Sequence, residues 1–156
     1  MRYYETFWRA GLIPHPPKDS PGYQVRITHR AFDRMLAGRL AKFGLKSGYW
    51  YYLRVLWINE GLTQKELSDA INVKETTTVT MLKGMERDAL VVRKRDDHDR
   101  RKICIFLTQK ARKLEAALLP IGLEINDIAL QSISSKDVKT CLKVLKQMRE
   151  NLHATS

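Results

Sequence analysis

A dense group of cationic side chains marks residues 93–102, where six of ten residues are basic: Arg93, Lys94, Arg95, Arg100, Arg101 and Lys102. Shortly before them stand Thr76, Thr77, Thr80 and Lys83, which lie outside the apolar stripe of a predicted helix. Guanidinium groups bind phosphates, and threonine hydroxyls and methyl groups contact phosphates or base edges. These residue types at this spacing predict binding of a polyanion such as double-stranded DNA.

The composition restricts the other kinds of chemistry. The 156 residues carry a net charge of +11, and residues 23–60 hold +5 of it, so the charge is not one basic tail. Four scattered histidines show no metal-ligand spacing, and Cys104 and Cys141 form no CxxC pair. No nucleophile–base pair or paired carboxylates stand out. We therefore expect no metal, no cofactor and no enzyme activity.

The longest apolar run, residues 49–58, is interrupted by Arg54, so it does not predict a membrane-spanning helix. At the N-terminus, Arg9 and Pro14 break the short apolar patch that a signal peptide would need. These features predict a cytoplasmic protein with no membrane partner.

A helix-turn-helix followed by a hairpin is expected to position the polar and basic residues. Thr63-Gln64-Lys65-Glu66 is a capping box that begins a short helix, and a second helix runs from about residue 75 to 88. Its inward stripe is Val79, Leu82 and Met85. Gly84 interrupts this helix, which a close approach of another group to the backbone would explain. Residues 90–95 and 102–107 are predicted to form two strands on either side of a polar loop.

Longer helices are expected on both sides of this core. Residues 23–43 form one with a single apolar face, ended by Gly44, and Ser47 caps an apolar helix that includes residues 49–58. Thr108 caps a long helix that Pro120 should kink. Ser134 or Ser135 caps the last, whose stripe is Val138, Leu142, Leu145, Met148 and Leu152. Before them, aromatic residues Tyr3, Tyr4, Phe7 and Trp8 suit a short helix, followed by a proline-rich connector. The predicted fold class is mainly α with a small β-hairpin wing.

Residues 46–108 resemble the DNA-binding core of the multiple-antibiotic-resistance regulator (MarR) family, most specifically over 62–67, 77–79, 85–87, 99–101 and 107–108. The resemblance implies a winged helix-turn-helix core at 46–108, helical dimerisation regions at 23–45 and 109–156, and an N-terminal extension at 1–22. It also implies a cytoplasmic homodimer that represses transcription from a pseudo-palindromic operator until a small ligand releases it. A ligand-responsive activator and a winged-helix protein-interaction module are the alternatives, and a charged rather than apolar wing tip favours DNA.

The resemblance assigns roles to individual residues. Arg100 resembles the arginine at the wing tip that enters the minor groove of DNA. Asp99 resembles the acidic residue that orients the wing through an ion pair, and Arg101 resembles the partner in that ion pair or a phosphate contact. Thr80 stands where many relatives have arginine, and Ala89 where most have glycine, so the helix before it is expected to end differently. The candidate DNA-binding residues are Thr76, Thr77, Thr80, Lys83, Arg93, Arg95, Asp99, Arg100 and Arg101.

The signal that the protein senses is expected to be a small organic ligand. Peroxide sensors that resemble this fold need a reactive cysteine near the N-terminus, and here Cys104 and Cys141 are expected to be small buried residues. The expected pocket lies where the helix over 23–43 and the apolar helix that includes 49–58 meet the long helix that follows Thr108. Its candidate residues are Arg26, His29, Arg30, Tyr49, Trp50, Leu53 and Trp57. Their charge and aromatic character favour a small aromatic carboxylate or an aryl-CoA thioester.

Overall fold

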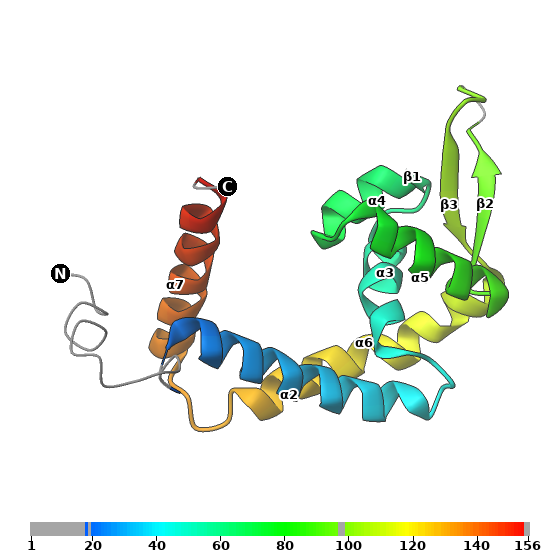
Figure 1. Ribbon diagram of the computed structural model, residues 1–156. Helices are drawn as coiled ribbons and strands as arrows, with labels where there is room; N and C mark the ends of the chain where they lie inside the picture. Colours follow the sequence, from blue (N-terminus) through cyan, green and yellow to red (C-terminus); the bar gives the residue numbers. More distant parts are fainter. Residues whose placement is uncertain (1–17, 19, 97–98, 155–156) are drawn as a thin grey trace.

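The computed structural model describes residues 18, 20–96 and 99–154, and most of this part of the chain is helical (Figure 1). The elements are α2 (Pro21–Ala41), α3 (Ser47–Ile58), β1 (Leu62–Thr63), α4 (Gln64–Ile71), α5 (Glu75–Arg87), β2 (Val91–Arg95), β3 (Ile103–Leu107), α6 (Gln109–Ala129) and α7 (Ser135–His153). The predicted fold class is confirmed. The aromatic helix expected near Tyr3 and Trp8 lies outside the described residues.

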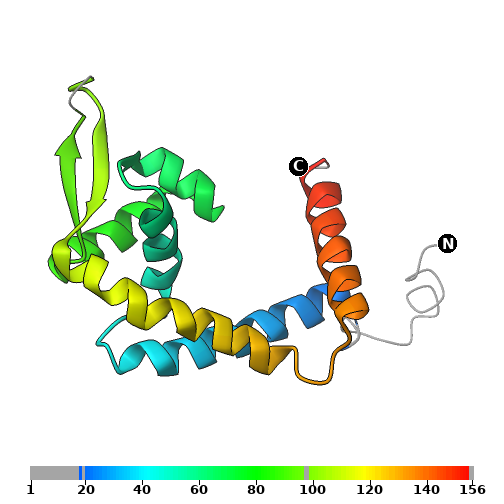
Figure 2. The ribbon, with the colours of Figure 1, turned by 180° about the vertical axis from the view of Figure 1, so that it is seen from behind.

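Two long helices form the base of the molecule. Helices α2 and α6 pack along each other, and α3, α4, α5 and the sheet stand on one end of this pair (Figures 1 and 2). Helix α2 begins at Pro21, two residues earlier than predicted, because the Ser20 hydroxyl accepts a hydrogen bond from the Tyr23 amide at 3.2 Å. The expectation that Ser47 caps α3 is wrong, since Lys46 is the capping residue and Ser47 is the first helical one.

The sheet has three antiparallel strands in the order β1-β3-β2. Val91 pairs with Leu107 at the base of the hairpin, and Arg95 pairs with Ile103 near its tip. The predicted hairpin is confirmed, with each strand starting one residue later than expected. The two-residue strand β1 was not predicted, because so short a segment shows no alternation that could reveal it.

Helix α3 lies at the centre of the hydrophobic core. Leu53 and Leu56 are fully buried, and they pack in one cluster with Leu67 of α4, Leu82 of α5 and Leu118 of α6. Since α3 touches α2, α4, α5, α6 and β3, it fixes the positions of the other elements. The sequence prediction that this apolar helix is buried on most sides is confirmed, although Ile58 at its end is 87% exposed.

The two C-terminal helices differ in how they pack. The Thr108 side chain caps α6 as predicted, accepting from the Ala111 amide at 3.2 Å, and α6 runs through Pro120 without a break. Ser134 caps α7, which stands apart from the rest of the chain (Figure 1) and has no buried residue. The prediction that Cys141 is buried is therefore wrong for this single chain, whereas Cys104 is buried as expected.

No helix in the described ranges is long and apolar enough to cross a membrane.

Candidate nucleic-acid interface

Helices α4 and α5 form the helix-turn-helix. The predicted capping box is present: the Glu66 carboxylate accepts from the Thr63 amide at 2.7 Å, and the Thr63 hydroxyl accepts from the Glu66 amide at 3.3 Å. The bond from the Thr63 amide, and a second one that the Thr63 hydroxyl donates to the same carboxylate at 2.7 Å, lower the pKa of Glu66. Helix α4 ends at Asn72, which takes the left-handed conformation at φ 59° and turns the chain tightly into α5.

A buried group of hydroxyls joins α4 and α5 to α3. The Ser68 hydroxyl lies 2.8 Å from the Thr78 hydroxyl and donates to the Gln64 carbonyl at 2.7 Å. The Tyr52 hydroxyl of α3 lies 3.3 Å from the same Thr78 oxygen. Ser68 and Thr78 are fully buried, so these bonds satisfy groups that would otherwise be costly to bury. The angle between α4 and α5 is thereby fixed by side-chain hydrogen bonds as well as by apolar packing.

The inward face of α5 differs by one residue from the sequence prediction. Thr78, Leu82 and Met85 are fully buried, whereas Val79 is only half-buried. The apolar pattern missed Thr78 because its hydroxyl is satisfied inside the core and therefore costs little to bury. Thr76, Thr77, Thr80 and Lys83 are exposed, as expected of a surface that faces a ligand.

Helix α5 is anchored to α3 through Gly84. The Tyr49 hydroxyl donates to the Asp88 carboxylate at 2.8 Å, and a Cβ atom on Gly84 would lie only 2.5 Å from that hydroxyl oxygen. The close approach proposed for Gly84 is thus confirmed, and its partner is the Tyr49 side chain. The bond from Tyr49, together with one from Arg87, lowers the pKa of Asp88, while burial and then Asp88 raise the pKa of Tyr49.

The hairpin of β2 and β3 projects beyond the helices (Figure 1). Some of its charged side chains are exposed or paired at the tip, and one is paired with α5. At the tip, the Asp99 carboxylate accepts from both the side chain and the amide of Arg101 at 3.1 Å, and these bonds lower the pKa of Asp99. Arg95 and Arg100 are exposed. Arg93 instead donates from Nε to the Glu86 carboxylate at 2.8 Å, which ties the hairpin to α5.

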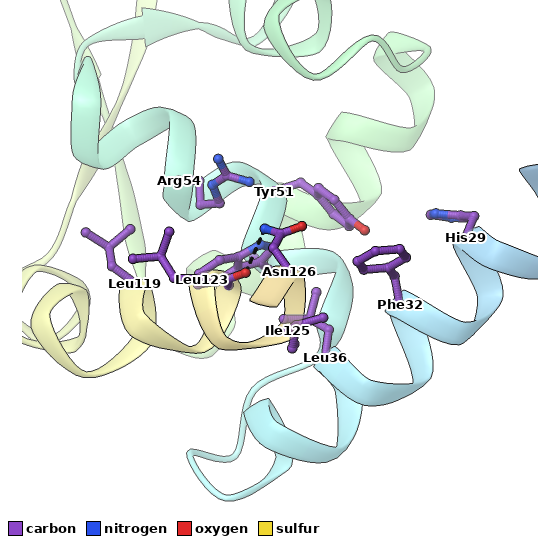
Figure 3. A pocket seen from close by; sticks show the side chains of 11 residues that line it. His29, Phe32, Leu36, Tyr51, Arg54, Leu119, Leu123, Ile125 and Asn126 are labelled. Atoms are coloured by element: carbon purple, nitrogen blue, oxygen red, sulfur yellow. Dashed lines mark hydrogen bonds between the residues drawn. The ribbon is translucent and has the colours of Figure 1, made fainter. Parts of the chain in front are cut away.

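A cavity of about 410 Å³ lies between α2, α3 and α6 (Figure 3). Arg54 and His29 lie at opposite ends of it in that view, and Tyr51 lies between them. The Arg54 guanidinium carbon is 5.7 Å from the centre of the Trp50 ring, and Trp50 packs edge-on against Trp57. The remaining lining is Phe32, Leu36, Leu119, Gly122, Leu123, Ile125 and Asn126. Aromatic walls with a cation at one end suit a planar anionic molecule.

Comparison with known proteins matches this architecture. The profile of the MarR family matches residues 43–102. The organic hydroperoxide resistance transcriptional regulator of Bacillus subtilis is 31% identical over 131 residues, covering 84% of this chain and 88% of the relative. The chain belongs to the MarR family. It is therefore related to DNA-binding transcriptional regulators with a winged helix-turn-helix.

Two solved MarR-type structures share the fold. The MepR–DNA complex of S. aureus has a TM-score of 0.79 at 23% identity, covering 85% of this chain and 98% of that chain. BpsR of Bordetella bronchiseptica, whose DNA binding is regulated by 6-hydroxynicotinic acid, has a TM-score of 0.78 at 16% identity, covering 88% and 98%.

The departure from the MarR pattern at Ala89 has a structural outcome that the sequence did not predict. The expectation that α5 ends differently here is wrong, because Ala89 adopts φ 55°, the left-handed conformation that favours glycine. The Leu90 amide donates to the Met85 carbonyl at 2.8 Å and the Ala89 amide to the Glu86 carbonyl at 3.0 Å. These two bonds form a Schellman motif, which holds the strained alanine in place.

Only part of the expected effector set lines the cavity. His29 and Trp50 do, but Arg26 and Arg30 are exposed on α2 away from the lining, and the Arg26 guanidinium lies over the Tyr23 ring. The other three residues do not line it either: Tyr49 points to Asp88, Leu53 is fully buried in the core, and the Trp57 indole donates to the Ala111 carbonyl.

Arg54 and Tyr51 line the cavity and were not among the expected residues. Helix α3 has apolar residues on nearly every side. Its sequence therefore shows no periodicity that would distinguish the side facing the cavity from the side facing α5. One signal was available, since Arg54 is the single charged residue of α3. A charge on an otherwise apolar helix marks the side that meets solvent or a ligand.

Across the described ranges, no three histidine, cysteine, aspartate or glutamate side chains come together closely enough to hold a metal ion.

Proposed function

We propose that the protein is a homodimeric transcriptional repressor, rather than an enzyme, that works in the cytoplasm. It binds a pseudo-palindromic operator and leaves it when a small aromatic carboxylate, or the corresponding aryl-CoA thioester, binds the dimer. The observation that carries the ligand assignment is the cavity with Arg54 at one end and His29 at the other. MarR-family membership supports the DNA-binding part.

The apolar stripe of α7 supports the dimer. Leu142 is 63% exposed and Leu152 is 67% exposed, and no residue of this 19-residue helix is buried within its own chain. An amphipathic helix gains stability from packing its apolar stripe, and a second copy can cover it. Residues 23–45 and 109–156 are thus assigned to dimerisation and residues 46–108 to DNA binding. A Leu142→Lys variant that stays dimeric in sedimentation would contradict this assignment.

The size and lining of the cavity support the ligand class. Small-molecule sites begin at roughly 300 Å³, so a volume of about 410 Å³ accommodates a single aromatic ring with its substituents. Arg54 supplies a cation for the carboxylate, and Phe32 and Trp50 supply apolar walls. BpsR, whose regulator 6-hydroxynicotinic acid is itself an aromatic acid, offers a parallel. A CoA thioester would place its aryl group here and leave its nucleotide outside.

Binding relieves repression only if the ligand prefers the dimer geometry that the operator disfavours. A coupling free energy of roughly 1–3 kcal/mol changes operator affinity by about 5- to 150-fold, which is enough for a switch. The switch has a direct route to the DNA-binding helices, because α3 both lines the cavity and contacts α4 and α5.

Calorimetry with benzoates, hydroxycinnamates and their CoA esters, alongside a gel shift, tests the proposal. We expect one class to bind the dimer and weaken the operator complex. Arg54→Gln and His29→Ala should weaken ligand binding while ligand-free operator affinity stays nearly unchanged. Arg26→Ala, an exposed arginine of α2 outside the lining, is the control. No binding across the panel, or binding that leaves the DNA complex intact, would overturn the ligand assignment.

A further inference from the structure

The exposed side of α5 carries a group of threonines, which we define as the threonine face: Thr76, Thr77 and Thr80. They lie on the surface of the helix whose opposite side buries Thr78, Leu82 and Met85. MarR-type folds present this helix to DNA. The chemistry of its three exposed threonines therefore limits which bases the helix can distinguish.

Side chains that read guanine or adenine with two hydrogen bonds are scarce on α5. The helix contains no asparagine or glutamine, and its one arginine, Arg87, is its last residue and donates to Asp88 at 3.2 Å. Lys83 is the remaining exposed cation within the helix. Bidentate contacts to guanine use arginine or lysine, and those to adenine use asparagine or glutamine. Apart from Lys83 and the paired Arg87, helix α5 therefore lacks the side chains that make bidentate hydrogen bonds to purines.

The Thr80 hydroxyl is already committed within the helix. It donates to the Thr76 carbonyl at 3.2 Å, four residues earlier. A hydroxyl has one proton, so in this geometry Thr80 has none left to donate to an acceptor atom of guanine or thymine. Its oxygen can still accept a hydrogen bond, and its methyl group is free for apolar contact. In the major groove, the C5-methyl of thymine is the one apolar group that distinguishes a base pair, and threonine methyl groups pack against it.

We propose that the threonine face selects the operator by packing against thymine methyl groups, so that thymines rather than guanines lie beneath α5 in each half-site. This inference rests on the proposed function, since it requires a sequence-specific operator. It assigns specificity to Thr76, Thr77 and Thr80, with Thr80 acting through its methyl group.

The test begins with selection of an operator from randomised DNA by the full-length protein. Each thymine of the selected site is then replaced by deoxyuridine, which lacks the methyl group and keeps every hydrogen-bonding atom. At thymines beneath the threonine face, we expect each replacement to weaken binding about fourfold, the effect of one buried apolar carbon group. At thymines elsewhere in the site, the replacement should have no effect.

Variants of Thr80 separate its methyl group from its hydroxyl. Thr80→Ser removes the methyl and should abolish sensitivity to deoxyuridine at one position per half-site, whereas Thr80→Val keeps a methyl and should retain it. Thr140→Ser is the matched control, because Thr140 is exposed on α7 outside the apolar stripe that we assign to the dimer. Its hydroxyl likewise donates to a carbonyl four residues earlier, that of Lys136.

The outcomes distinguish this inference from the function on which it rests. If no sequence is enriched by selection, the proposed sequence-specific repressor is refuted and the inference with it. If an operator is found but deoxyuridine is tolerated at every thymine, only the inference is overturned. The same holds if Thr80→Val loses discrimination while Thr80→Ser keeps it, because the hydroxyl would then be the reading group.

Discussion

Replacing Arg100 by alanine tests whether the hairpin tip contacts DNA. Arg100 is exposed beside the Asp99–Arg101 ion pair, and no residue of the described ranges forms an ion pair with it. Its charge is thus available to the sugar-phosphate backbone. The proposed dimer would carry two hairpins, so the substitution would remove two cations from its complex with DNA. Each neutralised phosphate contributes about 0.9 to the slope of log K against log salt, so we expect the slope to fall by about 1.8.

This change in slope has a direct experimental consequence. Over a fourfold rise in salt, from about 50 to about 200 mM, the wild-type protein should lose about twelvefold more affinity than the variant. The advantage of wild type is therefore largest at low salt and shrinks as salt rises. Fluorescence anisotropy with a labelled operator measures both curves under identical conditions.

Arg30→Ala is the matched control, because Arg30 is also an exposed arginine but lies on α2. Its salt dependence should coincide with that of wild type. If Arg100→Ala gave the same slope as wild type, the hairpin tip would not be close to phosphates, and the role carried over for Arg100 would be wrong. A parallel loss of slope in Arg30→Ala would point instead to a general effect of net charge.

Three further substitutions test the local structure of the DNA-binding core by urea denaturation. Ala89→Gly should stabilise the fold by about 1 kcal/mol, because glycine adopts φ 55° without strain; an unchanged midpoint would contradict the left-handed end of α5. Gly84→Ala should destabilise by about 1–3 kcal/mol, and less in a Tyr49→Phe background, since the added Cβ would meet the Tyr49 hydroxyl; equal losses in both backgrounds would exclude that contact. Thr63→Ala should cost about 1 kcal/mol by removing the side-chain cap of α4, and a neutral result would mean that Glu66 alone suffices.

Local signals in the sequence were sufficient to predict most of the fold. The box at Thr63 and Glu66 begins α4 as predicted, and the Thr108 side chain begins α6, because each cap depends on residues within one turn of helix. The hairpin was predicted because two segments that contain β-branched residues flank a polar loop. The start of α3 was misplaced by one residue, since Lys46 caps it through backbone geometry alone, without a side-chain hydrogen bond.

Features that depend on distant contacts were not predicted. Burial of Thr78 requires hydroxyl partners from α3 and α4, which are 26 and 10 residues away in sequence. The cavity is likewise assembled from three helices, so the relevant side of α3 could not be deduced from a helix that is apolar nearly all round. The left-handed Ala89 was predicted wrongly because local preference opposes it, while the Schellman hydrogen bonds and the packing of Leu90 enforce it.

The packing of α3 connects the cavity, where we propose that a ligand binds, with the helix-turn-helix. Trp50 and Arg54 face the cavity, where Trp50 packs so closely on α6 that a Cβ on Gly122 would lie 2.6 Å from its ring. On other sides of the same helix, Tyr49 hydrogen-bonds to Asp88 at the end of α5, and Tyr52 lies within hydrogen-bonding distance of Thr78 within α5. A closely packed helix moves as a rigid unit, so a shift of its cavity side also moves the side that contacts α5. In the proposed repressor, a ligand that moved α3 away from α6 would therefore shift α5 together with α3, and the distance between the two α5 helices of the proposed dimer would change.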